Sequence, residues 1–268
     1  MFMPLRQIFR SRAGRRQLPR VPEGERYYVI GDIHGCLHLF DALLAAIEAD
    51  DARAGEAQTT IVLLGDLVDR GPDSAGVIRG AMRLAQQRRV RLLAGNHEEM
   101  FLHAFENVGN LRHFVKHGGR ETILSYGIPL ERYNGLSLEE LLAELPALVP
   151  EEHLAFLRGF EEIVVAGDYA FVHAGIDPSR SIEEQDRQSL LWIRERFLRH
   201  TAPYSHMIVH GHTIFDEVAE HGNRIGIDTG AYRTGRLTAL ALEGEIRRFF
   251  TTTDNGDSIS IEEQGSTS

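Results

Sequence analysis

Short apolar runs alternate with stretches of helical periodicity along the N-terminal part of the chain. Residues 27–31, 60–64 and 90–94 form apolar runs of the length expected for buried strands. Residues 37–49 place apolar side chains at helical spacing, and Ser74 is the expected N-cap of a second helix that ends near residue 87. A third helix is expected from about Glu98. This β-α-β-α-β order predicts a parallel sheet with right-handed crossovers.

The rest of the chain predicts a helical segment followed by short strands. Residues 99–160 are mostly helical in pattern, and we interpret them as a helical insertion rather than a second domain. The tight sequence 243–245 is expected to join the last two strands as a hairpin. The whole predicts a single α/β domain over residues 27–250, with two packed sheets flanked by helices. The expected later strands are 162–166, 169–173, 206–210, 224–228, 236–242 and 245–250.

The composition is that of an ordinary globular protein. Of 268 residues, 43% are hydrophobic and 25% are charged, which is typical of soluble domains. No apolar run approaches the roughly 20 residues that a membrane-spanning helix needs, so no transmembrane segment is expected. Cys36 is the sole cysteine, which excludes an internal disulfide, and we expect a cytoplasmic location. The net charge of −10 argues against broad, non-specific binding to nucleic acid.

The two ends of the chain carry opposite charge. Residues 1–26 contain seven arginines and two glutamates, and we interpret them as a flexible basic tail. A short amphipathic arm and an organelle-targeting presequence are the alternatives. Residues 251–268 contain four acidic side chains and no basic one. Their small, polar composition predicts a disordered acidic tail.

Side chains that can bind metals or transfer protons come directly after the expected strands. Because ligands of open α/β sheets bind at the carboxyl ends of the strands, these side chains are expected to converge. Carboxylate, amide and imidazole groups without any thiolate suit Mn²⁺, Fe or Zn²⁺. The segments are GDIHG (31–35), GDLVDRG (65–71), GNHE (95–98), VHAG (172–175) and VHGHT (209–213), which contain Asp32, His34, Asp66, Asp69, Asn96, His97, His173 and His212.

These five segments, in this order, resemble the motifs of the metallophosphoesterases, and specifically of the PPP-type phosphoprotein phosphatases. The small bacterial and phage members, such as the phage lambda phosphatase, are the nearest match. The resemblance covers about residues 27–245 and includes residues 117–127, 190–196 and 227–232. It implies a calcineurin-like two-sheet sandwich flanked by helices (αββα) and a metal-dependent phosphoric monoester hydrolase.

The resemblance further implies a dinuclear metal centre in which one carboxylate bridges the two ions. Two such ions lower the pKa of a bridging water, and the resulting hydroxide would attack phosphorus in line. Divalent Mn is the expected metal in vitro, and Fe/Zn and Fe/Mn pairs also suit these ligands. Asp32, His34 and Asp66 would bind one ion, and Asp66, Asn96, His173 and His212 would bind the other.

Four further side chains receive catalytic roles from the resemblance. His97 would protonate the leaving alkoxide, and Asp69 would orient His97 and keep it protonated. Arg70 and Arg194 would hold the phosphate, because a guanidinium group matches pairs of phosphate oxygens. Arg194 is the weakest of these assignments, since its surroundings read as a charged helix.

Several neighbouring residues have more ordinary interpretations. His210 reads as a packed or supporting histidine rather than a ligand. Asp228 either orients a ligand histidine or stabilises a turn, and the two remain equal. Asp177 reads as a solvated loop residue and Cys36 as a packed core residue, and Arg196 reads as a surface residue.

The leading functional hypothesis is hydrolysis of phosphoprotein or phosphopeptide esters of serine and threonine, with phosphotyrosine as a further candidate. Small aryl phosphates would be substrates in vitro. The alternative is a symmetrical diadenosine tetraphosphate hydrolase, in which the residue matching Asp69 is typically not an aspartate. A phosphodiesterase ranks lower, because the pair of His97 and Asp69 suits a poor alkoxide leaving group. A non-catalytic metal-binding protein would have lost ligands or the acid, and no such loss is visible.

Overall fold

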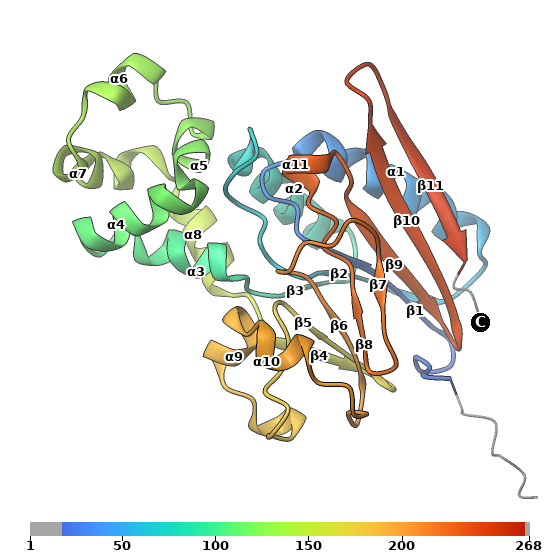
Figure 1. The fold of residues 1–268 in the computed structure, drawn as a ribbon. Coiled ribbons are helices and arrows are strands. Elements are labelled where there is room, and N and C mark those ends of the chain that lie inside the picture. Colours follow the sequence, from blue (N-terminus) through green and yellow to red (C-terminus); the bar gives the residue numbers. More distant parts are fainter. Residues whose placement is uncertain (1–17, 266–268) are drawn as a thin grey trace, which may run out of the picture.

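The computed structural model describes residues 18–265 (Figure 1). Most of the expected basic tail, residues 1–17, lies outside the described part of the chain, as do residues 266–268. Between residues 18 and 265, no helix combines the length and apolar character needed to cross a membrane.

The larger sheet has six strands in the order β11-β10-β9-β1-β2-β3. The first three strands of the chain are parallel, while β9 runs antiparallel to β1 and pairs Ala241 with Tyr28. These parallel strands correspond to the β-α-β-α-β pattern read from the sequence. The strands are β1 (Glu25–Ile30), β2 (Gln58–Leu63), β3 (Val90–Leu92), β9 (Thr238–Glu243), β10 (Ile246–Asp254) and β11 (Ile259–Gly265).

The smaller sheet has five strands in the order β4-β5-β6-β8-β7. Its central strands β5, β6 and β8 are parallel, and the outer strands β4 and β7 are antiparallel to their neighbours. The strands are β4 (Ile163–Ala166), β5 (Tyr169–Val172), β6 (Met207–His210), β7 (Ala219–Glu220) and β8 (Arg224–Gly226).

The alternation of side chains along β1 separates two apolar cores. Tyr27 and Val29 belong to a core that also contains Phe171 of the smaller sheet, so this core fills the space between the sheets. Tyr28 and Ile30 belong to the core formed with the helices. Successive side chains of a strand point to opposite faces, and both faces of β1 are therefore buried. This explains why residues 27–30 of β1 read as a continuous apolar run.

Helices α1 (Leu37–Arg53) and α2 (Ser74–Gln87) connect the parallel strands and pack on the outer face of the larger sheet. The N-cap of α2 is Asp73, whose side chain accepts the Gly76 N–H, and not Ser74 as expected. Helices α4 to α7 project to one side of the sheets (Figure 1). The helical segment contains α3 (Asn96–His103), α4 (Val108–Phe114), a π-helical turn (Val115–Gly119), α5 (Arg120–Ser125), α6 (Leu130–Gly135), α7 (Leu138–Leu148) and α8 (Glu151–Arg158).

The later helices are short. They comprise a 3₁₀ turn (Ile182–Glu184), α9 (Arg187–Trp192), α10 (Glu195–Leu198) and α11 (Ala231–Thr234). Two sheets flanked by helices confirm the fold class expected from the sequence.

The prediction of a disordered C-terminal tail is wrong for residues 251–265. Strand β10 continues to Asp254, and β11 pairs with it along its whole length. Ile259 and Ile261 pack against the helix-side core, while Glu262 and Glu263 on β11 remain exposed. Two isoleucines on an edge strand therefore outweigh the polar composition on which the prediction rested.

The folded domain begins before the expected boundary at residue 27. Val21 is buried, and its N–H donates to the Gly244 carbonyl at 3.1 Å. Arg26 is only 1% exposed and is held by Asp51 and Glu243. Residues 18–26 are thus part of the folded domain rather than of a flexible tail.

Candidate metal centre

The expected site residues meet at one edge of the molecule because the strands of both sheets end there. Asp32 and His34 come after β1, and Asp66 comes after β2. In the smaller sheet, His173 is next after β5 and His212 comes shortly after β6. Parallel strands place the residues at their carboxyl ends along the same edge, and here two sheets direct their ligands to a shared space. Asn96 and His97 form the first turn of α3, shortly after β3.

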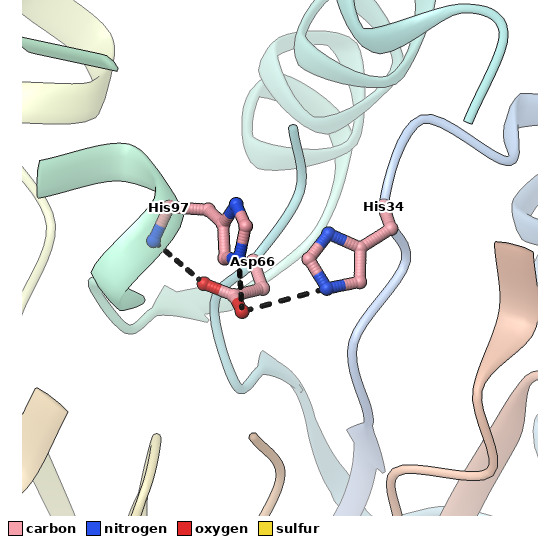
Figure 2. A group of neighbouring side chains, drawn as sticks. All are labelled: His34, Asp66 and His97. Atoms are coloured by element: carbon pink, nitrogen blue, oxygen red, sulfur yellow. Dashed lines mark hydrogen bonds and ion pairs between the residues drawn. The ribbon is translucent and has the colours of Figure 1, made fainter. Parts of the chain in front are cut away.

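Asp66 lies at the centre of this group. Its Oδ2 is 3.5 Å from Nε2 of His34 and 3.9 Å from Nε2 of His97 (Figure 2). Its Oδ1 is 3.4 Å from Nε2 of His173. Burial alone would raise the pKa of Asp66, but the surrounding imidazoles hold it below its usual range. A carboxylate with two oxygens directed to different histidines is suited to join two ions. The candidate ligand groups that share it are His34, Asp66 and His97, and Asp66, His173 and His212.

The histidine tautomers leave ring nitrogens that can bind a metal ion. Nδ1 of His34 lies 2.8 Å from the Val68 carbonyl, and Nδ1 of His173 lies 2.8 Å from the Leu64 carbonyl. A carbonyl only accepts, so each Nδ1 carries the proton and each Nε2 presents a lone pair. Both Nε2 atoms lie within 3.5 Å of the Asp66 carboxylate, and that of His34 also accepts from Arg70. Burial lowers the pKa of both histidines, which keeps them neutral and able to bind a metal.

Asn96 supplies an oxygen to the second group. Its Oδ1 lies 3.0 Å from Nε2 of His173 and 2.8 Å from Nδ1 of His212. Arg194 also contacts His212, since its Nε–H donates to Nε2 of His212 at 2.9 Å. Burial and the neighbouring His173 lower the pKa of His212 to about 2. The amide oxygen and neutral imidazoles form a ligand set for a borderline metal ion.

Asp32 is a buried carboxylate of which only one oxygen accepts a hydrogen bond. Its Oδ2 accepts the His212 N–H at 2.9 Å, whereas its Oδ1 is buried without a hydrogen-bond partner among the described residues. Burial and the charges of Asp228 and Asp66 raise the pKa of Asp32 well above its usual range. Buried carboxylates are normally paired or bound to metals. The donor set therefore fits metal ions at the positions that the sequence indicated.

His97 and Asp69 form a buried pair beside this centre. Nδ1 of His97 lies 2.6 Å from Oδ2 of Asp69, whose other oxygen accepts the Thr122 hydroxyl at 2.7 Å. Burial tends to lower the pKa of His97, but the charge of Asp66 and the hydrogen bond to Asp69 outweigh it and raise that pKa. The opposite nitrogen of the ring faces Asp66. This geometry can hold a proton next to a group bound at the centre.

Arg70 spans the opening between two of the histidines. Its Nη1 lies 2.8 Å from Nε2 of His34, and its Nη2 lies 2.9 Å from Nε2 of His97. The Tyr232 ring covers it, with its centroid 5.0 Å from the guanidinium carbon and 5.3 Å from the centroid of the His34 ring. Sequence reasoning assigned no role to Tyr232, although it ends the segment IDTGAY. The Tyr232 side chain is 37% exposed, so it lies beside the centre at the protein surface.

Arg194 does not lie in a helix, contrary to the reading of its surroundings. Helix α9 ends at Trp192 and α10 begins at Glu195, so Arg194 occupies the break with φ −133° and ψ −98°. The break turns its side chain toward His212.

Backbone strain is concentrated at the same residues. Among the described residues, the non-glycine residues with positive φ are His34, Asp66, Asp69, Arg70 and His212, and all five are candidate site residues. Such conformations are costly for residues with a Cβ and cluster where function requires them. Gly95 shows how tightly the loops pack, since a Cβ there would lie 2.1 Å from Asp66 Oδ1.

The sequence-based interpretations of the neighbouring residues agree with the structure in some cases and differ in others. His210 packs edge-on against Phe197, with ring centroids 5.0 Å apart, as expected for a packed histidine. Asp228 lies beside Asp32 and accepts the Gly230 N–H at 2.9 Å, which is the turn-stabilising role. Asp177 is buried and pairs with Arg196 at 2.9 Å, which corrects its reading as a solvated loop residue. Cys36 is buried, as expected.

Glu98 supports the centre and escaped sequence reasoning, which treated it only as part of the GNHE motif. Its carboxylate accepts the backbone N–H groups of Gly95, Asp66 and Leu67 at 2.9, 2.7 and 2.7 Å. Burial and the charge of Asp66 raise its pKa to about 7, and these N–H groups oppose that rise. The sequence did contain a signal for this role. Glu98 is the third helical residue after the N-cap Gly95, which is the position of the glutamate in a capping box.

We expect Glu98→Gln to destabilise the protein by about 2–4 kcal/mol, because the amide NH₂ group would face backbone N–H donors. Urea unfolding of both proteins, with equal metal content, measures the difference. Glu139→Gln is the control, since Glu139 is exposed in the first turn of another helix, α7. Equal stability of Glu98→Gln and the parent protein would show that the turn after β2 does not depend on this carboxylate.

The sequence belongs to a known family. Residues 25–229 match the family model described as calcineurin-like phosphoesterase, and the chain is therefore a calcineurin-like metallophosphoesterase. The resemblance read from the five motifs is confirmed.

The relatives carry different activities. The chain is 28% identical over 232 residues to the asymmetrical bis(5'-nucleosyl)-tetraphosphatase PrpE of Anoxybacillus flavithermus, covering 80% of this chain and 89% of that protein. It is also 28% identical over 222 residues to serine/threonine-protein phosphatase 2 of Escherichia coli, covering 79% and 90%. A cold-active protein-tyrosine phosphatase of a Shewanella species shares the fold, with a TM-score of 0.53 at 19% identity over 91% of this chain and 83% of that chain.

Proposed function

We propose that this protein is a two-metal phosphomonoesterase that hydrolyses phosphoserine and phosphothreonine esters in proteins, with phosphotyrosine as a further substrate. The observation that carries the proposal is the buried contact of 2.6 Å between His97 and Asp69. A serine or threonine alkoxide is a poor leaving group and needs a proton as its bond to phosphorus breaks. A histidine with a raised pKa beside the metal centre supplies that proton.

The metal ions, when bound, would lower the pKa of a water between them and neutralise charge on the phosphoryl oxygens. One ion would be held by Asp32, His34 and Asp66, and the other by Asp66, Asn96, His173 and His212. Both shells contain oxygen and imidazole donors, so Mn²⁺, Fe/Zn and Fe/Mn pairs are all compatible.

The remaining side chains bind and orient the ester. Arg70 lies between His34 and His97, and Arg194 reaches the opposite side of the centre at His212. Two guanidinium groups on either side of the centre match the oxygens of one phosphate. With the phosphate held between them, His97 would be the proton donor to the leaving oxygen.

Hydrolysis of dinucleoside tetraphosphates is the second candidate. It is favoured by the tetraphosphatase of Anoxybacillus flavithermus, which is as similar to this chain as the Escherichia coli phosphatase. A phosphate leaving group needs less protonation than an alkoxide. This reaction would therefore not need the proton that the pair of His97 and Asp69 can supply. For this reason we prefer hydrolysis of phosphoproteins as the proposed function.

We expect the metal-loaded protein to hydrolyse a phosphoserine peptide with a higher kcat/KM than diadenosine tetraphosphate. The measurement offers both substrates in parallel to protein that was stripped of metal and reloaded with Mn²⁺. Phosphate release reports the first reaction, and separation of the nucleotides reports the second. A higher kcat/KM for the dinucleotide would overturn the proposal and assign the protein to nucleotide hydrolysis.

A further inference from the structure

Glu99 connects two parts of the chain that carry opposite sides of the metal centre. It lies on α3, two residues after His97, and its side chain contacts α9. Its Oε2 accepts the Trp192 Nε1–H at 2.8 Å, and its Oε1 accepts the Arg187 Nε–H at 2.9 Å. Both donors belong to α9. A single carboxylate thus fastens α9 to the helix that begins with Asn96 and His97.

The fastened segment leads directly to Arg194. Trp192 is the last residue of α9, Ile193 is extended, and Arg194 occupies the break before α10. Its Nε contacts His212 at 2.9 Å. Within residues 18–265, Arg194 forms no ion pair with an acidic side chain. The direction of its guanidinium group therefore depends on where the end of α9 is held.

We propose that Glu99 is a positioning residue that sets Arg194 at the phosphate site by holding Trp192. The proposal rests on the proposed function, in which Arg194 binds the phosphate. A charged acceptor that receives two N–H donors is a strong and directional contact. Trp192 is rigid and lies two residues before Arg194, so a shift of its ring is passed to the arginine. Small displacements of a positioning group are costly to substrate binding.

The segment has other anchors, so loss of Glu99 should displace it rather than unfold it. The Ala174 N–H donates to the Leu190 carbonyl at 2.8 Å, and Asp186 caps the start of α9. Phe197 is fully buried and packs against Gly175, where a Cβ would lie 2.4 Å from its ring. These contacts hold both ends of the segment and leave the Trp192 contact to fix its tilt.

The chain offers a matched control. Arg187 also donates to Glu162 through Nη1 at 2.8 Å. Glu162→Ala therefore removes a carboxylate from the same arginine without touching Trp192. If Glu99 acts only by neutralising Arg187, the two substitutions should behave alike. If it acts through Trp192, they should differ.

The test measures kcat and KM for a small aryl phosphate, and the inhibition constant of inorganic phosphate, in the Mn²⁺-loaded protein. We expect Arg194→Ala to weaken phosphate binding roughly tenfold or more, as loss of a charge-assisted hydrogen bond does. We expect Glu99→Ala to weaken it roughly three- to tenfold with a smaller change in kcat. Glu162→Ala should change it less than twofold, and Glu99→Gln, which keeps an oxygen for Trp192, should recover most of the loss.

The decisive variant combines Glu99→Ala with Arg194→Ala. If Glu99 acts through Arg194, the double variant should bind phosphate no more weakly than Arg194→Ala alone, because coupled residues are not additive. Full additivity, or equal effects of Glu99→Ala and Glu162→Ala, would overturn the positioning role. If Arg194→Ala itself leaves phosphate binding unchanged, the failure lies in the role that the proposed function gives to Arg194.

Discussion

Replacing Asp66 with asparagine is expected to reduce phosphate ester hydrolysis by about a thousandfold or more, since a metal contributes several kcal/mol to such a reaction. Asparagine keeps one oxygen but loses the charge that faces the imidazoles of His34, His97 and His173. It can still accept the His97 N–H that Asp66 accepts at 3.0 Å, so the fold should persist. Turnover of an aryl phosphate and the metal content per chain are the two measurements.

The control for this substitution is Asp216→Asn, which neutralises an exposed carboxylate outside the site. It should retain both metal and activity. Circular dichroism of Asp66→Asn should match the parent protein. Retention of two ions and of turnover in Asp66→Asn would refute the shared role of this carboxylate.

Replacing His97 with asparagine is expected to slow alkyl phosphate hydrolysis by about 10²–10⁴-fold, the usual contribution of a general acid. Aryl phosphates should lose much less, because a phenolate leaves without full protonation. The ratio of the two losses is the informative quantity. It is obtained from kcat for a phosphoserine peptide and for an aryl phosphate with the same enzyme preparation.

His103→Asn is the control, since His103 lies on the same helix α3 and its side chain is 55% exposed. It should leave both substrates unaffected. Equal losses on the alkyl and aryl substrates in His97→Asn would contradict the general-acid role and point to a role in binding alone.

The sequence predicted the sandwich because most of its strands are buried on two faces. Residues 27–30 of β1 and the whole of β5 are unbroken apolar runs, and the positions of such strands along the chain can be read directly. Strand β11 was not predicted, because only Ile259 and Ile261 pack inward and its other face is exposed to solvent. Edge strands that depend on a neighbour carry a weak local signal.

The candidate ligands were also readable, because each lies just past the end of a strand. The sequence could not show how groups far apart in the chain support one another. Glu98 accepts backbone N–H groups about thirty residues away, after β2. Arg194 reaches His212 only because the helix breaks at its own position. Both contacts arise from tertiary packing, which composition and periodicity do not predict.

The most direct test of the two-metal centre is a titration of metal-stripped protein with Mn²⁺, with hydrolysis of an aryl phosphate measured at each step. Asp66 is directed to histidines on both sides, so activity should be absent without metal and should reach its maximum at two ions per chain. Full activity in the presence of chelator, or a maximum at one ion per chain, would contradict the account.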